Sequence, residues 1–442
     1  MIKLNKRNIT NIYLIIFLFI SCIDLYVVVL GLSFKLLYFV SIPLLVAALF
    51  HASIFPVNKL EKWLYLWLLS YFFSIGNLIS VSDWIITVLG QIVLILIYKG
   101  IIIQCSTKDK LKYFEHILII GFSIIVMIGI LQFALYYALG ITWGISHQKT
   151  VGLARPRSLT LEPDWYGLIC MILSIYMVIH YAANKRVFKS NRTDIVIMVS
   201  SLIGLIISMA RATWLGFAFA MLVFLVCKID KKTKKRILKI AYVALASIVV
   251  ALILIGVASP QLFINIFNRI NIFQSAKTDG GATATRISSI EIMLHFFKLH
   301  PITGNGVGGM NAISTDSELL ASLGYFYEIN AGRGNANIII TNLFDVGIIG
   351  TLFLLLFFIE FFKMMIKCYK KTKDLTILCY IFIFIALLTD FQFNNGIRQA
   401  YVWILLGFAV SRYRLLMRSQ SSNVNNRKIV SKNLYNCMPI VQ

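Results

Sequence analysis

The stretch Leu153–Gly167, L-A-R-P-R-S-L-T-L-E-P-D-W-Y-G, is a polar island between two apolar runs. It places two arginines, a glutamate and two prolines at the mouth of a predicted membrane helix. Burying charge beside a membrane is expensive, so polar residues that are kept in such a position usually have a functional role. The sequence therefore predicts a membrane scaffold on both sides of this island and a functional site close to it.

The composition is that of an integral membrane protein. Of the 442 residues, 59% are hydrophobic and 14% are charged, and the mean hydropathy is +0.83. Apolar runs of about 18 residues or more, the length that spans a bilayer, recur along the sequence. The net charge of +24 would suit a nucleic-acid partner. The charges are distributed by loop rather than by face, however, so we expect no nucleic-acid partner.

Neither disulfide bonds nor a metal centre is predicted. The seven cysteines stand singly, without a C-x-x-C motif, and the two longest predicted external loops contain none of them. The same loops carry no D-x-D motif. We therefore expect a site without a metal ion or another cofactor.

The apolar runs predict an all-α polytopic fold with about 12 transmembrane helices. A large external loop is expected between helices 9 and 10, and it contains an amphipathic helical pattern over residues 286–300. The predicted spans are 12–30, 36–55, 63–80, 84–103, 117–139, 166–183, 195–210, 213–226, 240–257, 337–362, 375–391 and 400–417.

Most of the 42 lysines and arginines fall on one side of these spans, which predicts that both termini lie inside. The weak point is 195–226, which could form one helix. Such a helix would be roughly 48 Å long against a core of about 30 Å, so we expect a break at 209–212 that leaves Arg211 outside. The resulting segments are 1–140 (helices 1–5), 141–165 (first external loop), 166–257 (helices 6–9), 258–336 (large external loop), 337–417 (helices 10–12) and 418–442 (a disordered inner tail).

Arginines on the predicted outer side need an explanation, because the preference for positive charge inside does not account for them. An anionic ligand is one explanation, since a guanidinium binds diphosphate bidentately and stays charged. Contact with lipid phosphate, or pairing with Glu162, Asp164 or Glu291, is the alternative. Arg211 is the strongest candidate for a ligand because membrane helix flanks it on both sides. The outer arginines are Arg155, Arg157, Arg211, Arg269, Arg286, Arg333 and Arg398.

Other polar residues give weaker signals. Glu162 is either a general base or the ion-pair partner of Arg157, and its place at a helix N-terminus favours the anion and argues against strong basicity. The run after His300-Pro301, G-N-G-V-G-G, is a candidate phosphate loop that lacks the Walker lysine. Intramembrane acids can mark proton paths, and the candidates are Asp24, Asp345 and Asp390.

Four motifs in order resemble the bacterial O-antigen polymerase and O-antigen ligase superfamily of membrane glycosyltransferases, over residues 155–350. Two residues separate the serine and arginine of the second motif, where that family has none. The motifs are Arg155 followed by Glu162-Pro163; S-M-A-R-A-T-W-L-G at 208–216; Arg286 followed by H-P-x-x-G-x-G-x-G at 300–308; and Asn337 followed by D-V-G-I-I-G at 345–350.

The resemblance implies a glycosyltransferase of the bacterial inner membrane with its active face in the periplasm. It points to the Wzy-type polymerase branch, because Ala336 stands where the ligase branch typically has histidine. Such an enzyme transfers a growing chain from undecaprenyl diphosphate to a lipid-linked acceptor, and a chain-length regulator is a further expected partner. We expect Arg155, Arg211 and Arg286 on the diphosphate, Glu162 as base, and Arg157, His300 and Asn337 around the substrate. A ligase, or a flippase or other transporter, is the alternative.

Overall fold

The computed structural model describes residues 6–23, 25–29, 32–51, 58–147, 154–227, 231–240, 242, 282–324 and 337–436. Several sequence predictions fall outside these residues. They concern Asp24, Arg269, Arg333, Ala336 and most of the predicted span 240–257.

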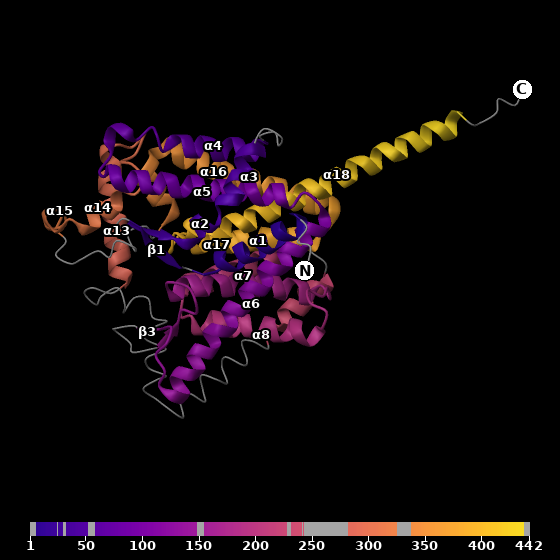
Figure 1. Cartoon of the computed structure of the whole chain (residues 1–442), viewed down its shortest axis with the longest axis horizontal. Coiled ribbons are helices and arrows are strands. Elements are labelled where there is room, and N and C mark those ends of the chain that lie inside the picture. The colour runs from indigo at the N-terminus through magenta and orange to yellow at the C-terminus, as the bar shows by residue number, and fades with distance from the viewer. Residues whose placement is uncertain are drawn as a thin grey trace, which may run out of the picture.

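Helices dominate the described residues, and two short hairpins are added to them (Figure 1). The elements are α1 (Lys6–Ser21), β1 (Tyr26–Val29), β2 (Leu32–Lys35), α2 (Leu36–Val40), α3 (Ile42–His51), α4 (Lys59–Ser70), η1 (Ile75–Asn77), α5 (Val81–Gln104), α6 (Lys108–Leu139), β3 (Ile145–His147), β4 (Ala154–Pro156), α7 (Pro163–Ala182), α8 (Asn191–Ile207), α9 (Arg211–Val226), α13 (Ala282–Leu299), α14 (Gly309–Thr315), α15 (Ser317–Ser322), α16 (Ile338–Thr372), α17 (Leu375–Asp390), η3 (Gly396–Arg398) and α18 (Ala400–Asn436).

Five helices in the described part of the chain are long and apolar enough to cross a membrane. They are α5, α6, α7, α16 and the first part of α18, and shorter apolar helices include α9 and α17. The fold is thus that of an all-α membrane protein. The figure of twelve spans stays a prediction.

The N-terminal predictions were wrong in detail. The first helix ends at Ser21, and residues 26–29 instead form a strand that pairs with residues 32–35 in an antiparallel hairpin. The second predicted span is split into α2 and α3 at Ser41. Pro43 lies in the first turn of α3, where its missing N–H is tolerated, whereas inside a longer helix it would remove a hydrogen bond. The third span stops at Ser70 and is followed by a 3-10 turn.

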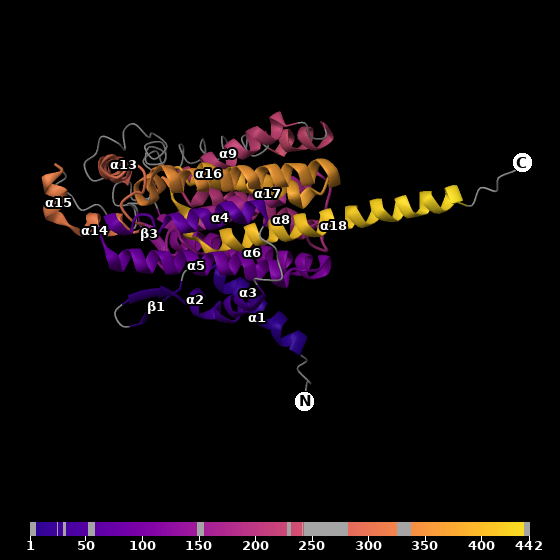
Figure 2. The same ribbon diagram turned by 90° about the horizontal axis from the view of Figure 1, so that it is seen from above.

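The break predicted at 209–212 is confirmed, within a residue or two. Helix α8 ends at Ile207, α9 begins at Arg211, and Met209 between them has the left-handed φ of 52°. The C-terminal prediction was wrong, because α18 continues to Asn436 where a disordered tail was expected. Figures 1 and 2 show this extension leaving the helical bundle at the end opposite to α13, α14 and β3.

Helix α7 lies at the centre of the bundle, and 89% of its most apolar 18-residue stretch is buried. Two glycines let the neighbouring helices come close to it. A Cβ on Gly167 of α7 would lie 2.9 Å from both Ala210 Cβ and Ser208 Oγ at the α8–α9 break. A Cβ on Gly216 of α9 would lie 2.7 Å from the carbonyl oxygen of Ala386 in α17. The start of α7 is therefore held against the break between α8 and α9.

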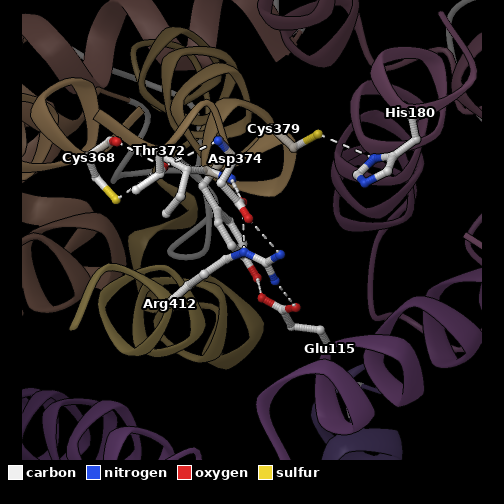
Figure 3. A network of polar contacts seen from close by, with 9 residues as sticks. Glu115, His180, Cys368, Thr372, Asp374, Cys379 and Arg412 are labelled. Atoms are coloured by element: carbon white, nitrogen blue, oxygen red, sulfur yellow. Dashed lines mark hydrogen bonds and ion pairs between the residues drawn. The ribbon is translucent and has the colours of Figure 1, made fainter. Parts of the chain in front are cut away.

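At the end of the bundle opposite to the start of α7, Arg412 of α18 contacts α6 and the start of α17 (Figure 3). Arg412 Nη1 lies 2.7 Å from Glu115 Oε2, and its Nε donates to Asp374 Oδ1 at 2.8 Å. Arg414 and Lys99 both pair with Glu61, which is fully buried. We call these six residues the α18 network. It ties α18 to α4, α5, α6 and the start of α17.

Candidate functional site

The polar island folds as a hairpin that leads into α7. Strand β4 pairs with β3 so that Arg155 lies opposite Ser146, and the side chain of Arg155 is 13% exposed. Arg157, two residues on and past the end of the strand, is exposed, and its backbone N–H donates to the carbonyl of Gly144. The described contacts thus make Arg155 part of the site, and the contact of Arg157 with substrate stays a prediction.

Arg155 connects three parts of the fold. Its Nη2 lies 2.6 Å from Asp164 Oδ1 in the first turn of α7. Its Nε donates to the carbonyl oxygen of Ser208 at 2.9 Å. That carbonyl is available because α8 ends there and the last carbonyls of a helix have no partner within the helix. The break between α8 and α9 therefore provides an acceptor that fixes the orientation of this guanidinium.

Two further arginines converge on the same carboxylate. Arg286 of α13 places its Nη2 3.6 Å from Asp164 Oδ2. Arg211, the first residue of α9, interacts electrostatically with Arg286, Asp164 and Arg155. We call Arg155, Arg211, Arg286 and Asp164 the arginine cluster. The three arginines expected to bind one ligand are 56 to 131 positions apart in the sequence, yet the fold brings them together.

The electrostatics of the arginine cluster favour an anion. The ion pairs that Arg155 and Arg286 make both end on Asp164, so two guanidinium groups share one carboxylate. The N-termini of α7 and α9, which begin at Pro163 and Arg211, add the positive ends of two helix dipoles. Guanidinium groups bind phosphate oxygens bidentately. The arrangement is suited to hold a phosphate or diphosphate and to stabilise negative charge that develops on it.

Asp164 is the site residue that the sequence did not single out, except as one of three partners for the outer arginines. Glu162, the predicted base, is the N-cap residue of α7, and its carbonyl oxygen accepts from the backbone N–H of Trp165 and of Tyr166. An acidic residue in a first helical turn is favoured by the dipole, which was the signal available for Asp164. The side chain of Glu162 is partly exposed, and its catalytic role stays a prediction.

The glycine-rich run is a docking segment in this structure. The N–H groups of Asn305 and Gly306 donate to the carbonyls of Phe344 and Asp345 at 2.8 and 3.1 Å. The N–H of Gly304 donates to the carbonyl of His300 at 2.9 Å. The acceptors on α16 are released by a kink at Gly347, with φ 66° and ψ −167°. These N–H groups are thus bonded within the protein, and a phosphate loop is not supported.

Asn337 also has a structural position. Its Oδ1 accepts from the N–H groups of Ile339 and Ile340 and so caps α16, while its Nδ2 donates to the carbonyl of Gln392 at 3.1 Å. Both ends of the amide are therefore occupied by the protein. Its predicted contact with substrate would require these bonds to be exchanged.

Two of the acids named in the sequence lie near the same end. Asp345, next to the kink of α16, has its Oδ2 3.9 Å from Arg398 Nη2. Asp390, the last residue of α17, is fully buried and interacts electrostatically with Asp164 and Arg286. Asp390 therefore belongs to the surroundings of the arginine cluster, which its position in the sequence alone did not indicate.

Comparison with known proteins gives one family. The model of the Wzy_C family, described as O-antigen ligase, matches residues 196–355. The match includes Arg211 and Arg286, and it supports membership in the O-antigen polymerase and ligase superfamily. No curated protein matches the chain.

Proposed function

We propose that this chain, a membrane enzyme of the O-antigen polymerase and ligase type, polymerises lipid-linked oligosaccharide repeat units. The donor is the growing glycan on undecaprenyl diphosphate, and the acceptor is a sugar hydroxyl of a second lipid-linked repeat unit. The reaction takes place at the periplasmic face of the bacterial inner membrane, and both termini are cytoplasmic. The product is O-antigen or a related surface polysaccharide.

The convergence of Arg155, Arg211 and Arg286 on Asp164 carries this proposal. In the reaction, the acceptor oxygen forms a bond to the anomeric carbon, and the bond from that carbon to the diphosphate oxygen breaks. The diphosphate leaves with the electron pair, and the hydroxyl proton passes to a base. The difficult part is the negative charge that develops on the leaving group.

The arginine cluster would supply that stabilisation in place of a metal ion. Groups that are already oriented toward developing charge need little reorganisation, and such electrostatic effects are often the largest in catalysis. Asp164 holds Arg155 and Arg286 in position before substrate binds. Glu162, at the N-terminus of α7, is our candidate for the base, and a chain-length regulator is a proposed partner.

Ligation of finished glycan to a lipid A core is the second candidate, and the description of the matching family favours it. The same cluster would serve either reaction, because both have a diphosphate leaving group. We prefer polymerisation because Ala336 stands where the ligase branch typically has histidine. A flippase would need no group that stabilises a leaving diphosphate.

Gel patterns of surface polysaccharide would test the proposal. Strains would carry a deletion, the wild-type gene, Arg211→Ala, or the control Arg192→Ala, which changes an exposed arginine in the first turn of α8. A polymerase predicts that deletion and Arg211→Ala leave a core with a single repeat unit, while Arg192→Ala keeps the ladder and immunoblots show equal protein. Loss of all attached repeats with accumulation of lipid-linked long chains would select the ligase. An unchanged ladder after deletion would exclude both.

A further inference from the structure

A polar turn joins α17 to η3 beside the arginine cluster, with the sequence D-F-Q-F-N-N from Asp390 to Asn395. Several of its polar atoms are buried and have no hydrogen-bond partner among the residues that the structure describes. Leaving such a group without a partner is costly, and native proteins keep few of them. The atoms are both carboxylate oxygens of Asp390, Nδ2 of Asn394 and Oδ1 of Asn395.

The backbone holds this turn in one conformation. The N–H groups of Phe393 and Asn394 donate to the carbonyl of Asp390 at 2.8 and 2.9 Å. From α16, the N–H of Ile338 donates to the carbonyl of Phe391 at 2.8 Å. The side-chain amide of Asn337 donates to the carbonyl of the following residue, Gln392, at 3.1 Å. The buried side-chain atoms therefore belong to a rigid backbone, which is the kind of support that a binding site needs.

The turn also lies against the start of α7. A Cβ on Gly396 would lie 3.1 Å from Trp165 Cζ3, and Trp165 follows Asp164 directly. Asp390 interacts electrostatically with Asp164 and Arg286. The turn therefore lies near the arginine cluster. A substrate that binds or reacts at the arginine cluster can also contact the turn.

The chemistry of the turn matches a saccharide. A sugar hydroxyl donates one hydrogen bond and accepts others, and the unpartnered atoms include three acceptor oxygens and one donor nitrogen. Apolar side chains accompany them, since Phe393 is 43% exposed and Trp165 is partly exposed. Aromatic rings with a few well-placed polar groups are typical of small-molecule sites.

We propose that Asp390, Asn394 and Asn395 form a subsite for the hydroxyl groups of the acceptor saccharide. This inference rests on the proposed function, which it deepens by separating two parts of the site. The arginine cluster holds the diphosphate of the donor, and the turn binds the sugar that attacks it. Asn394 and Asn395 are partly exposed, so rotation about their side-chain bonds presents the buried amide atoms to a ligand. Asp390 is fully buried, so a sugar hydroxyl reaches its carboxyl group only when side chains of the turn move.

The test uses the full chain in lipid nanodiscs and a probe without diphosphate. Mild acid releases the free repeat-unit saccharide from lipid-linked material of the deletion strain, and binding is followed by saturation-transfer NMR titration. We expect Asp390→Asn, and separately the double variant Asn394→Ala with Asn395→Ala, to bind about tenfold more weakly than wild type, as loss of a hydrogen bond of ordinary strength predicts.

Two control variants separate the possible results. Gln392→Ala lies in the same turn, but its amide already donates to the carbonyl of Leu388 at 3.0 Å, so binding should not change. Arg286→Ala should also bind the free saccharide normally, because the probe carries no diphosphate. Asp390→Asn is nearly isosteric, and elution volume and melting temperature would verify that each variant is folded.

Three results would overturn the subsite. They are wild-type binding by both turn variants, no binding by the wild-type protein, or a loss of binding in Arg286→Ala equal to that in Asp390→Asn. None of these results changes the gel test of the proposed function, which depends on Arg211. Failure of the subsite and failure of the polymerase are therefore distinguishable.

Discussion

The two ends of the helical bundle both contain buried charge, but they balance it differently. In the α18 network, Arg412, Arg414 and Lys99 meet Glu61, Glu115 and Asp374, so the described cations and carboxylates are equal in number. In the arginine cluster, three arginines surround Asp164. Helix α17 links the two ends, with Asp374 at its start and Asp390 about 24 Å away at its end.

The difference separates a structural role from a functional one. A balanced and fully paired network needs no ligand, and its Arg412 bonds to both Glu115 and Asp374 at 2.7 to 2.8 Å. In the arginine cluster, by contrast, Arg155 and Arg286 share the single carboxylate of Asp164, which suits the binding of a further anion. We infer that the α18 network holds the helices together and that the arginine cluster binds substrate.

The largest effect on stability is expected for Arg412→Ala. It removes the shared partner of two carboxylates, and breaking a buried ion pair typically costs about 3–5 kcal/mol because a charge is left without compensation. We expect the melting temperature of the detergent-solubilised protein to fall strongly, and the amount of folded protein to fall with it. Arg192→Ala is the matched control. A melting temperature equal to wild type would remove the structural role of the network.

The reverse pattern is expected for Arg286→Ala. The ion pair of Arg286 with Asp164 is long, at 3.6 Å, and the arginine is 29% exposed, so little stability should be lost. Loss of one group that stabilises developing charge typically lowers the rate by about 10²- to 10³-fold. Polymerisation by purified protein on extracted lipid-linked repeat units would measure this, beside the melting temperature. Equal losses of stability and activity would contradict a functional rather than structural role for Arg286.

A smaller and indirect effect on stability and activity is expected for a substitution at the kink of α16. Gly347 has φ 66° and ψ −167°, a region open almost only to glycine, and an added Cβ would contact the carbonyl of Ile302. Gly347→Ala should therefore cost about 1–3 kcal/mol. It should also lower activity, because the segment docked at the kink directly follows α13, which carries Arg286. Gly76→Ala, where an added Cβ meets no atom within 4 Å, is the control for both measurements.

These residues also show what the sequence could predict. Apolar runs and the length of 195–226 predicted the all-α class and the break before Arg211, because those features follow from local composition and bilayer thickness. The motifs predicted that Arg155, Arg211 and Arg286 act together. The sequence did not predict that Asp164 would be their common partner.

The glycine-rich run and Asn337 were difficult to interpret from sequence for the same reason. Whether a glycine-rich run binds phosphate or packs on a helix depends on which distant carbonyls are free, and the kink at Gly347 decides this for Asn305 and Gly306. Asn337, which was expected to contact substrate, caps α16 in the structure, as Asn commonly does at helix starts, and its contact with substrate stays a prediction. Local patterns identify the donors in such cases, and only the tertiary structure identifies their acceptors.

The smallest effect is expected for the stability that the α18 network contributes at low pH. Burial alone would raise the pKa of Asp374, but the hydrogen bonds and positive charge of Arg412 outweigh burial and lower it. A carboxyl whose pKa is lower in the folded state stabilises the protein above its unfolded pKa of about 3.9, and the contribution is lost as the pH falls through the folded pKa. We therefore expect wild type to lose stability below about pH 4. Asp374→Asn should lack this part of the acid transition, with an effect of about 1 kcal/mol or less. Melting curves from pH 7 to pH 3 would measure it, and identical acid transitions in both proteins would show that Asp374 is not held ionised by Arg412.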